Sequence, residues 1–287
     1  MFRTISVIGG DLRQLTLAKK LSVDGYDVSV YGFSNGINTD SLNHTDSISA
    51  ALDSEVIVLP VTVSFDMQSI HSPYSDKIIT ITEMLDKINP LSIVYGGCIS
   101  NELSEEFEKR KIKHKDYMLR DELAIRNAIP TAEGAIEIAI SETPITIHHS
   151  RCLVLGYGKV GKILAKSINA LGADAYVAAR KYADLALIEG HGYYPLSVNE
   201  AKMRLNDFDI IFNTVPALIL TKNELNNVRD DALIIDLASK PGGVDFNSAK
   251  ELDKKVIWAL SLPGKTAPVT AGIIIKDTII NMLREEE

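Results

Sequence analysis

A glycine-rich turn between an apolar run and an amphipathic stretch constrains this chain more than any other feature. Residues 156–161 read Gly-Tyr-Gly-Lys-Val-Gly, with the apolar run 152–155 before them and helical spacing over 160–171 after them. In such a strand–turn–helix unit the first glycine permits the tight turn, the second lets the backbone approach a pyrophosphate, and the third lets helix and strand pack closely. The helix N-terminus adds N–H groups and a partial positive charge. The motif predicts a dinucleotide site formed by Gly156, Tyr157, Gly158, Lys159, Val160 and Gly161.

The residues at the end of the next expected strand select the dinucleotide. Sites for NAD carry an Asp or Glu about 20 residues beyond the first glycine, where the carboxylate bonds the ribose 2′-hydroxyl. In this chain Arg180 and Lys181 stand there, Arg180 being 24 positions after Gly156. A guanidinium binds a 2′-phosphate through two hydrogen bonds, whereas a carboxylate repels it. The pair predicts NADP as the cofactor, and the alternative is a solvated basic pair at a helix start.

Short apolar runs alternate with amphipathic stretches over most of the chain. Strands are expected at 4–8, 28–31, 56–59, 92–95, 151–155, 175–179, 209–213, 232–236 and 256–260. Helices are expected at 11–24, 82–88, 101–111, 160–171, 182–189 and 270–283. This pattern favours parallel sheets covered by helices. We expect an α/β protein with two Rossmann-like doubly wound parallel-sheet domains separated by a cleft.

The two domains are expected to join near a proline. Residues 121–127 and 131–141 are helical in pattern with Pro130 between them, and Thr131 is a candidate cap for the second stretch. We interpret them as one long connecting helix, straight or kinked, followed by a linker at 143–150. The expected domains are 1–142, completed by a C-terminal helix at 271–287, and 143–270.

Ligands of open α/β sheets bind beyond the carboxyl ends of the strands. In the second domain one strand leads into Asn213, Thr214, Val215 and Pro216, which are expected at the cofactor. Another strand leads into a glycine turn that carries Lys265. Lys265 is a candidate partner for a substrate carboxylate, and the alternative is an exposed loop lysine.

The first domain opens on a related turn that lacks the third glycine. Gly9 and Gly10 follow the first strand, but Arg13 and Gln14 stand where a pyrophosphate would need room. We therefore expect a Rossmann-like domain that binds no dinucleotide and whose helix N-terminus, with Arg13, meets an anionic substrate. A surface arginine in the first helical turn is the alternative.

The composition limits the classes of binding partner and indicates the cellular compartment. The 287 residues carry a formal charge of −8, which disfavours non-specific binding to nucleic acid or to an anionic membrane. The two cysteines, Cys98 and Cys152, both stand in apolar surroundings, which predicts reduced core thiols in a cytoplasmic protein. The histidines lack zinc spacing, so no metal site is expected, and no apolar stretch is long enough to span a membrane.

Several blocks together resemble the dipicolinate synthase family, in particular its A subunit. They are Gly9-Gly10-Asp11-x-Arg13-Gln14, the stretch 120–135, the glycine motif at 156–161, Ala179-Arg180 and the block Leu-Pro-Gly-Lys-Thr-Ala-Pro-Val-Thr-Ala at 262–271. The likeness covers nearly the whole chain. It implies an enzyme of endospore-forming bacteria, cytoplasmic in the mother cell during sporulation. It also implies an oligomeric complex with a smaller, flavoprotein-like B subunit.

The resemblance implies a reaction as well. Dihydrodipicolinate, from the lysine pathway, would be oxidised to dipicolinate with a nicotinamide cofactor. The substrate is a dianion that loses a hydride to NADP and a proton to a base or to water, so orientation is most of the protein's task. Two carboxylates need two anchors, for which Arg13 and Lys265 are candidates, and Glu133 is a candidate base.

Enzymes of two other kinds and one non-catalytic protein fit parts of the pattern. A 2-hydroxy-acid dehydrogenase needs a late histidine, but no histidine follows His191, which disfavours that class. An alanine-dehydrogenase-like enzyme would share the late Pro-Gly block. A non-catalytic NADPH-binding regulatory protein would need only the glycine motif. Turnover of dihydrodipicolinate, with and without the flavoprotein-like partner, distinguishes these alternatives.

Overall fold

The computed structural model describes residues 4–39, 41–45 and 47–286, and these fold into two compact units. Unit 1 contains the chain up to Arg126 and from Ala267 onward, and unit 2 is Asn127–Thr266. The parts of the expected domains at 1–3, 40, 46 and 287 lie outside the described residues. Both units are α/β with parallel sheets, so the predicted fold class is confirmed.

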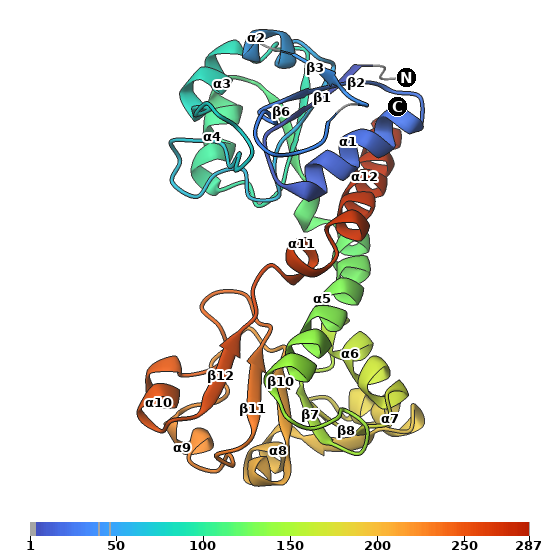
Figure 1. Cartoon of the computed structure of the whole chain (residues 1–287), viewed down its shortest axis with the longest axis vertical. Coiled ribbons are helices and arrows are strands. Elements are labelled where there is room, and N and C mark those ends of the chain that lie inside the picture. Colours follow the sequence, from blue (N-terminus) through green and yellow to red (C-terminus); the bar gives the residue numbers. More distant parts are fainter. Residues whose placement is uncertain (1–3, 40, 46, 287) are drawn as a thin grey trace. The chain divides into compact units, whose positions relative to one another are not determined.

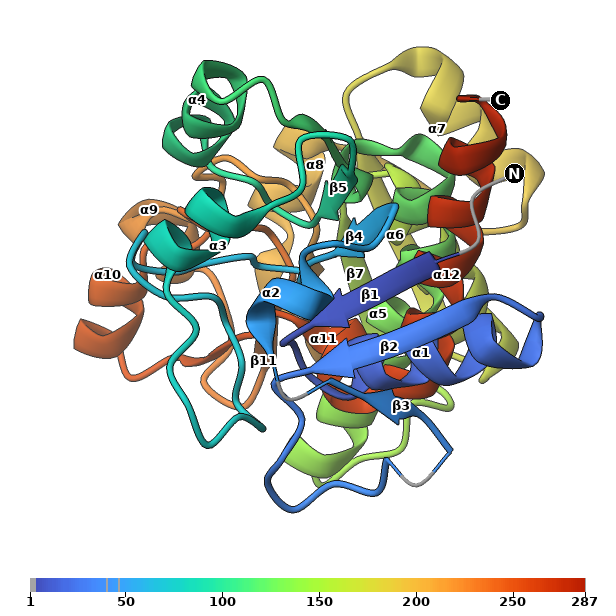
Figure 2. The same cartoon turned by 90° about the horizontal axis from the view of Figure 1, so that it is seen from above.

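Unit 1 is built on a six-stranded sheet in the order β3-β2-β1-β4-β5-β6. Every pairing between these strands is parallel, and Figure 2 shows β3, β2 and β1 side by side at one edge. This order is that of a dinucleotide-binding Rossmann fold. The strands are β1 (Thr4–Ile8), β2 (Asp27–Tyr31), β3 (Asn43–His44), β4 (Val56–Val58), β5 (Ile93–Gly96) and β6 (Lys113–Asp116).

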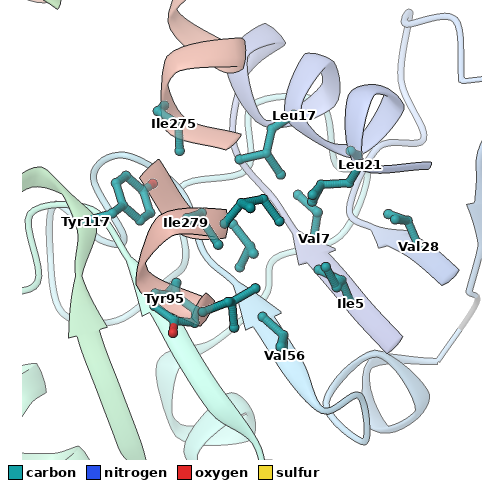
Figure 3. Close-up of a cluster of buried hydrophobic side chains, with 14 of the residues drawn as sticks. Ile5, Val7, Leu17, Leu21, Val28, Val56, Tyr95, Tyr117, Ile275 and Ile279 are labelled. Atoms are coloured by element: carbon teal, nitrogen blue, oxygen red, sulfur yellow. The ribbon is translucent and has the colours of Figure 1, made fainter. Parts of the chain in front are cut away.

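Helices cover both faces of this sheet. Helices α1 (Leu12–Val23) and α12 (Pro268–Arg284) lie side by side on one face (Figure 1). Figure 3 shows their side chains, among them Leu17 and Ile279, gathered over Val7 and Val56 of the sheet. The other face is covered by α2 (Ile48–Ala51), α3 (Ile81–Lys87) and α4 (Asn101–Lys109). A short 3-10 turn, η1 (Tyr117–Leu119), follows β6.

A close approach of backbones explains why α12 packs on α1. A Cβ added to Gly272 would lie 2.5 Å from the carbonyl oxygen of Arg13 and 2.8 Å from Cβ of Thr16. Only a glycine lets the two helices approach this closely. The C-terminal helix therefore completes unit 1, from Ala267 onward rather than from the expected residue 271.

Unit 2 repeats the same topology. Its sheet has the order β12-β11-β10-β7-β8-β9. When the strands are numbered 1 to 6 within the unit and read from the β9 edge, this is the order 3-2-1-4-5-6, the same as in unit 1. All pairings are parallel. The strands are β7 (Arg151–Leu155), β8 (Asp174–Ala179), β9 (Tyr194–Ser197), β10 (Ile210–Asn213), β11 (Leu233–Asp236) and β12 (Lys255–Trp258).

Two sets of helices enclose this sheet, because alternate strand residues point to opposite faces. Cys152 and Val154 meet α6 (Lys159–Ala170) and α7 (Tyr182–Gly190), whereas Leu153 and Leu155 face the opposite core. That second core includes α8 (Val198–Met203), α9 (Lys222–Leu225) and α10 (Phe246–Glu251). The turn η2 (Leu205–Asp207) and the short helix α11 (Leu262–Thr266) complete the unit. Helix α11 lies where the sequence led us to expect a glycine turn.

One continuous helix, α5 (Asp121–Glu142), contains Pro130 in its interior. Thr131 does not cap a second helix: its hydroxyl donates to the Asn127 carbonyl at 2.7 Å, one turn back. The expected first domain ran to residue 142, but residues 127–142 belong to unit 2. Small residues on one face of α5, Ala132, Ala135 and Ala139, are buried in the core of that unit.

The two cysteines differ in their exposure to solvent. Cys98 is exposed in a left-handed turn with φ of 54°, so the prediction of a core thiol is wrong for it and confirmed for the buried Cys152. The error arises because Cys98 lies just beyond β5 rather than within it.

Among the described residues no helix has the length and apolar character needed to cross a membrane.

Candidate functional site

A pocket of about 720 Å³ opens at the carboxyl ends of β7 and β8 in unit 2. This is the switch point of the sheet, since β10 lies on one side of β7 and β8 on the other. Eight of the residues predicted to bind the cofactor line this one pocket, namely Gly156, Tyr157, Gly158, Arg180, Lys181, Thr214, Val215 and Pro216. The structure thus brings together residues that are up to 60 positions apart in the sequence (216 − 156).

The helix that begins at this pocket has no side-chain cap. Helix α6 follows Gly158 as its N-cap residue, and glycine has no side chain with which to cap the first turn. A Cβ added to Gly158 would meet nothing within 4 Å, so the space above this residue is open. An uncapped N-terminus with open space before it is what a bound pyrophosphate requires.

The other two glycines of the motif serve the local fold. Gly156 has φ of +100°, and a Cβ on it would lie 2.5 Å from the Thr214 hydroxyl oxygen. A Cβ on Gly161 would collide with the Gly156 carbonyl oxygen. The fold itself therefore requires glycine at these two positions, whereas Gly158 is required only if a ligand occupies the open space.

Two cationic side chains stand at the edge of the pocket. Arg180 and Lys181 follow β8 directly, are exposed, and have no ion-pair partner among the described residues. Asp184, in the first turn of α7, also lines the pocket and is half-buried. The net local charge is positive, because two cations face one carboxylate.

Two predicted cofactor residues, Asn213 and Thr214, hold the loop after β10 in shape, and of these only Thr214 lines the pocket. Asn213 is fully buried and donates to the Asp236 carboxylate at 2.8 Å, while its own side-chain oxygen accepts from the Val215 N–H at 3.1 Å. The Thr214 hydroxyl donates to the Leu155 carbonyl at 2.8 Å. Asn213 therefore shapes the loop after β10 without reaching the pocket itself. Lys159, Val160 and Gly161 lie in the first turn of α6 behind the loop.

Tyr157 lines the pocket, but its side chain is directed into the protein. It is 8% exposed, and its hydroxyl lies 2.7 Å from Nδ1 of His191 at the end of α7. Asp184, Val198 and the segment 217–219 also line the pocket and were not predicted from the sequence. Val198 follows β9, a strand that was likewise not predicted.

The corresponding turn of unit 1, between β1 and α1, has neither the open space nor the uncapped helix N-terminus found at the glycine motif of unit 2. Asp11 is the N-cap of α1, and its carboxylate accepts from the Arg13 N–H at 2.9 Å. The fully buried Gln14 leaves no space at the turn, because a Cβ on Gly10 would lie 2.6 Å from its Cγ atom. The helix N-terminus that was expected to meet an anionic substrate is thus already occupied by the Asp11 carboxylate.

Arg13 pairs with this same carboxylate. Its Nε and Nη2 atoms donate to Asp11 at 2.9 and 2.7 Å, and its side chain is 15% exposed. Burial raises the pKa of Asp11, but the hydrogen bonds and charge of Arg13 outweigh burial and hold that pKa below its usual value. No partner contacts Nη1 of Arg13 in the described part of the chain, so this edge of the guanidinium can still donate to a ligand.

Backbone hydrogen bonds join the loops around this pair. The Gly10 N–H donates to the His71 carbonyl at 2.8 Å, His71 N–H to the Val63 carbonyl at 2.8 Å, and Val63 N–H to the Gly97 carbonyl at 3.1 Å. A Cβ on Gly97 would lie 2.5 Å from the Val61 carbonyl oxygen. The paired glycines of unit 1 thus allow the loops after β1, β4 and β5 to pack closely.

The remaining two candidates, Lys265 and Glu133, belong to unit 2 and do not line its cofactor pocket. Lys265 is exposed on α11 of unit 2. Glu133 is exposed on α5 and lines a groove with Ser167 and Leu171, at the end of α6 opposite to the glycine motif. This groove shares no residue with the cofactor pocket. The roles of both residues stay predictions.

Two sheets of Rossmann order, one with an open glycine loop and one with a capped turn, define a dehydrogenase-like protein. A family model for the N-terminal domain of the dipicolinate synthase A subunit matches residues 4–118, and a model for shikimate/quinate 5-dehydrogenase matches residues 137–256. The chain is 36% identical to the A subunit of dipicolinate synthase from Bacillus subtilis (strain 168), covering 98% of this chain and 96% of that one. The chain belongs to the family of dipicolinate synthase A subunits.

Solved structures agree with this assignment. The crystal structure of the dipicolinate synthase A subunit from Bacillus halodurans superposes with a TM-score of 0.90 at 35% identity, over 98% of this chain and 97% of that one. An L-alanine dehydrogenase matches with a TM-score of 0.69 at 14% identity, over 96% and 88% of the two chains. The second likeness shows the fold alone.

Proposed function

We propose that this chain is the NADP-binding component of a dipicolinate synthase, which oxidises dihydrodipicolinate to dipicolinate during sporulation. The observation that carries the proposal is the open, uncapped glycine loop of unit 2 with Arg180 and Lys181 at its edge, in a member of this family. A family named as one component of a synthase implies a partner, and we propose a flavoprotein-like B subunit for that role. We place the complex in the cytoplasm of the mother cell.

The residues of the pocket fit a dinucleotide with a 2′-phosphate. The open space over Gly158 accepts a pyrophosphate, which the first turn of α6 would bind through backbone N–H groups. Arg180 would bind the 2′-phosphate through two hydrogen bonds, with Lys181 adding a second positive charge. The loop 214–219 would hold the remainder of the molecule. A bound nicotinamide supplies a hydride acceptor.

Binding of a substrate with two carboxylates requires positively charged side chains that also fix the orientation of the substrate. Each carboxylate of dihydrodipicolinate loses hydration on binding, and a guanidinium or ammonium group compensates for that loss. We assign Arg13, through its Nη1 edge, to one of the two carboxylates, and Lys265 stays a candidate carboxylate partner from the sequence. Asp11 holds the Arg13 guanidinium in place through hydrogen bonds to Nε and Nη2, so little side-chain entropy is lost when the substrate binds.

The test is turnover with defined components. Purified chain, with and without the flavoprotein-like partner, is mixed with dihydrodipicolinate and either NADP or NAD, and dipicolinate and reduced nicotinamide are measured together. The proposal expects dipicolinate and NADPH in equal amounts. Binding of NADP without any turnover, even with the partner present, would instead support a regulatory protein. An enzyme that oxidises alanine or a 2-hydroxy acid, and leaves dihydrodipicolinate unchanged, would point to a different substrate.

A further inference from the structure

His71 stands at the switch point of the unit 1 sheet, in the loop that follows β4. Its backbone is fixed on both sides, because its carbonyl accepts from Gly10 and its N–H donates to Val63. Its imidazole is half-buried and interacts electrostatically with both members of the Asp11–Arg13 pair. A fixed loop residue near the Arg13 guanidinium, which the proposed function assigns to the substrate, and at the position where open sheets bind ligands, is well placed for chemistry.

The charge state of the imidazole follows from its surroundings. Burial lowers the pKa of His71 below its usual value, the Arg13 charge lowers it further, and the Asp11 charge opposes both. His71 is therefore neutral at and above pH 7, with one ring nitrogen unprotonated and able to accept a proton.

Other titratable groups around the pair are poorer acceptors, among the residues that the structure describes. Burial raises the pKa of Tyr117, and partial desolvation of the thiol together with the nearby Asp116 charge raises that of Cys98, so both keep their protons near neutrality. The Asp11 carboxylate is paired with Arg13 and its pKa is lowered. Asp116 accepts from three backbone N–H groups. His71 is the neutral base of this cluster.

The imidazole can also be reached from outside. It lines a pocket of about 330 Å³ together with Phe65, whose ring centre lies 5.0 Å from that of His71. The charged residues on this side are Asp66, Asp76 and Lys77. Asp66 accepts from its own loop at Gln68 and Ser69, and Asp76 accepts from the Ser34 hydroxyl, so both carboxylates have other partners.

We propose that His71 is the proton acceptor of the dehydrogenation, an inference that rests on the proposed function above. Two adjacent saturated ring carbons of dihydrodipicolinate each lose one hydrogen. One C–H bond breaks with its electron pair leaving as a hydride to NADP, which is reduced to NADPH. The other C–H bond breaks with its proton passing to the unprotonated nitrogen of His71, and its electron pair forms the new ring double bond. The ring is oxidised and becomes aromatic.

The test compares His71→Gln and His71→Ala with His44→Gln, a control in the same unit whose ring bonds Thr39. Loss of a general base lowers kcat by about 100- to 1000-fold. The KM for NADP and the melting temperature stay unchanged. In the wild type kcat/KM falls as pH decreases through the His71 pKa, because an imidazolium cannot accept a proton. That acidic limb disappears in His71→Gln, and added imidazole restores part of the rate of His71→Ala.

Nitrogen NMR of histidine-labelled protein gives a readout that does not need turnover. The His71 resonance is expected to titrate below about pH 6.5 and to shift on addition of dipicolinate. If the wild type is active and His71→Gln keeps both its kcat and the fall of kcat/KM at acidic pH, the role of His71 is refuted while the proposed function stands. A wild type that does not oxidise dihydrodipicolinate overturns the proposed function first.

Discussion

Replacing Arg180 by aspartate tests whether the end of β8 selects NADP. Arg180 is exposed at the mouth of the 720 Å³ pocket and has no ion-pair partner among the described residues, so its removal breaks no internal contact that could unfold unit 2. A change in cofactor affinity of the Arg180→Asp variant therefore reflects binding itself and not a loss of folding stability.

The size of the effect has two parts. Loss of a charge-assisted contact to phosphate costs about 2 kcal/mol. A new carboxylate about 6 Å from a phosphate of charge about −1.5 adds about 1 kcal/mol of repulsion in a medium close to water, since the site is exposed. The sum of about 3 kcal/mol weakens NADP binding by about 150-fold. NAD carries no 2′-phosphate, so its affinity is expected to change less than about 3-fold.

Calorimetric titration of both cofactors measures these changes. Lys166→Asp is the matched control, because Lys166 is exposed on the same unit but lies outside the pocket and undergoes the same charge reversal. It should leave both affinities as they are. Equal weakening of NADP and NAD by Arg180→Asp, or a wild type that binds the two cofactors equally, would refute the reasoning.

Substitutions at three further positions, Arg13, Gly272 and Asp11, test unit 1. Arg13→Ala is expected to lower kcat/KM for dihydrodipicolinate by about 30- to 1000-fold with no change in NADP affinity, and Arg13→Lys to restore part of it, as steady-state kinetics with the flavoprotein-like partner would show. Gly272→Ala forces a Cβ to within 2.5 Å of the Arg13 carbonyl and should cost about 1–3 kcal/mol in thermal unfolding, whereas Gly190→Ala, with nothing within 4 Å, should cost none. Asp11→Asn should cost about 1–2 kcal/mol at pH 7. Because the folded pKa of Asp11 lies below 3.8, this difference is present above about pH 4 and vanishes as pH falls through that pKa in urea unfolding.

The fold was predictable because its strongest signals are local. The glycine motif and the apolar runs mark β1, β2, β4, β5 and β7, and each matches the structure within two residues. The edge strands β3 and β6 were missed because their residues, Asn43–His44 and Lys113–Asp116, are polar and lack an apolar run. The long connecting helix predicted across Pro130 is confirmed, and burial of one alanine-rich face accounts for the continuity of α5 through this proline.

The candidate sites were less predictable, since their contacts join distant segments. Arg180 could be found by its spacing from the glycine motif. Nothing in the sequence around Asn213 shows that a buried Asp236 would engage its side chain. Asp11 and Gln14 form a capping box, a pattern that is visible in the sequence and that accounts for the closed turn of unit 1. His71 has no sequence signal, because it comes from an irregular loop that only the backbone bonds to Gly10 and Val63 place at the sheet.

The most direct test of the account is an NADP titration of Gly158→Ala, combined with an unfolding curve. No atom lies within 4 Å of the added methyl group, and alanine adopts the φ of −82° found there, so the free energy of unfolding should change by less than about 1 kcal/mol. The methyl group would occupy the space assigned to the pyrophosphate, so NADP affinity should fall at least about 100-fold. Gly190→Ala, which also adds a methyl group into open space on unit 2, should change neither quantity. A stable Gly158→Ala protein that binds NADP as tightly as the wild type would contradict the claim that this loop holds the cofactor.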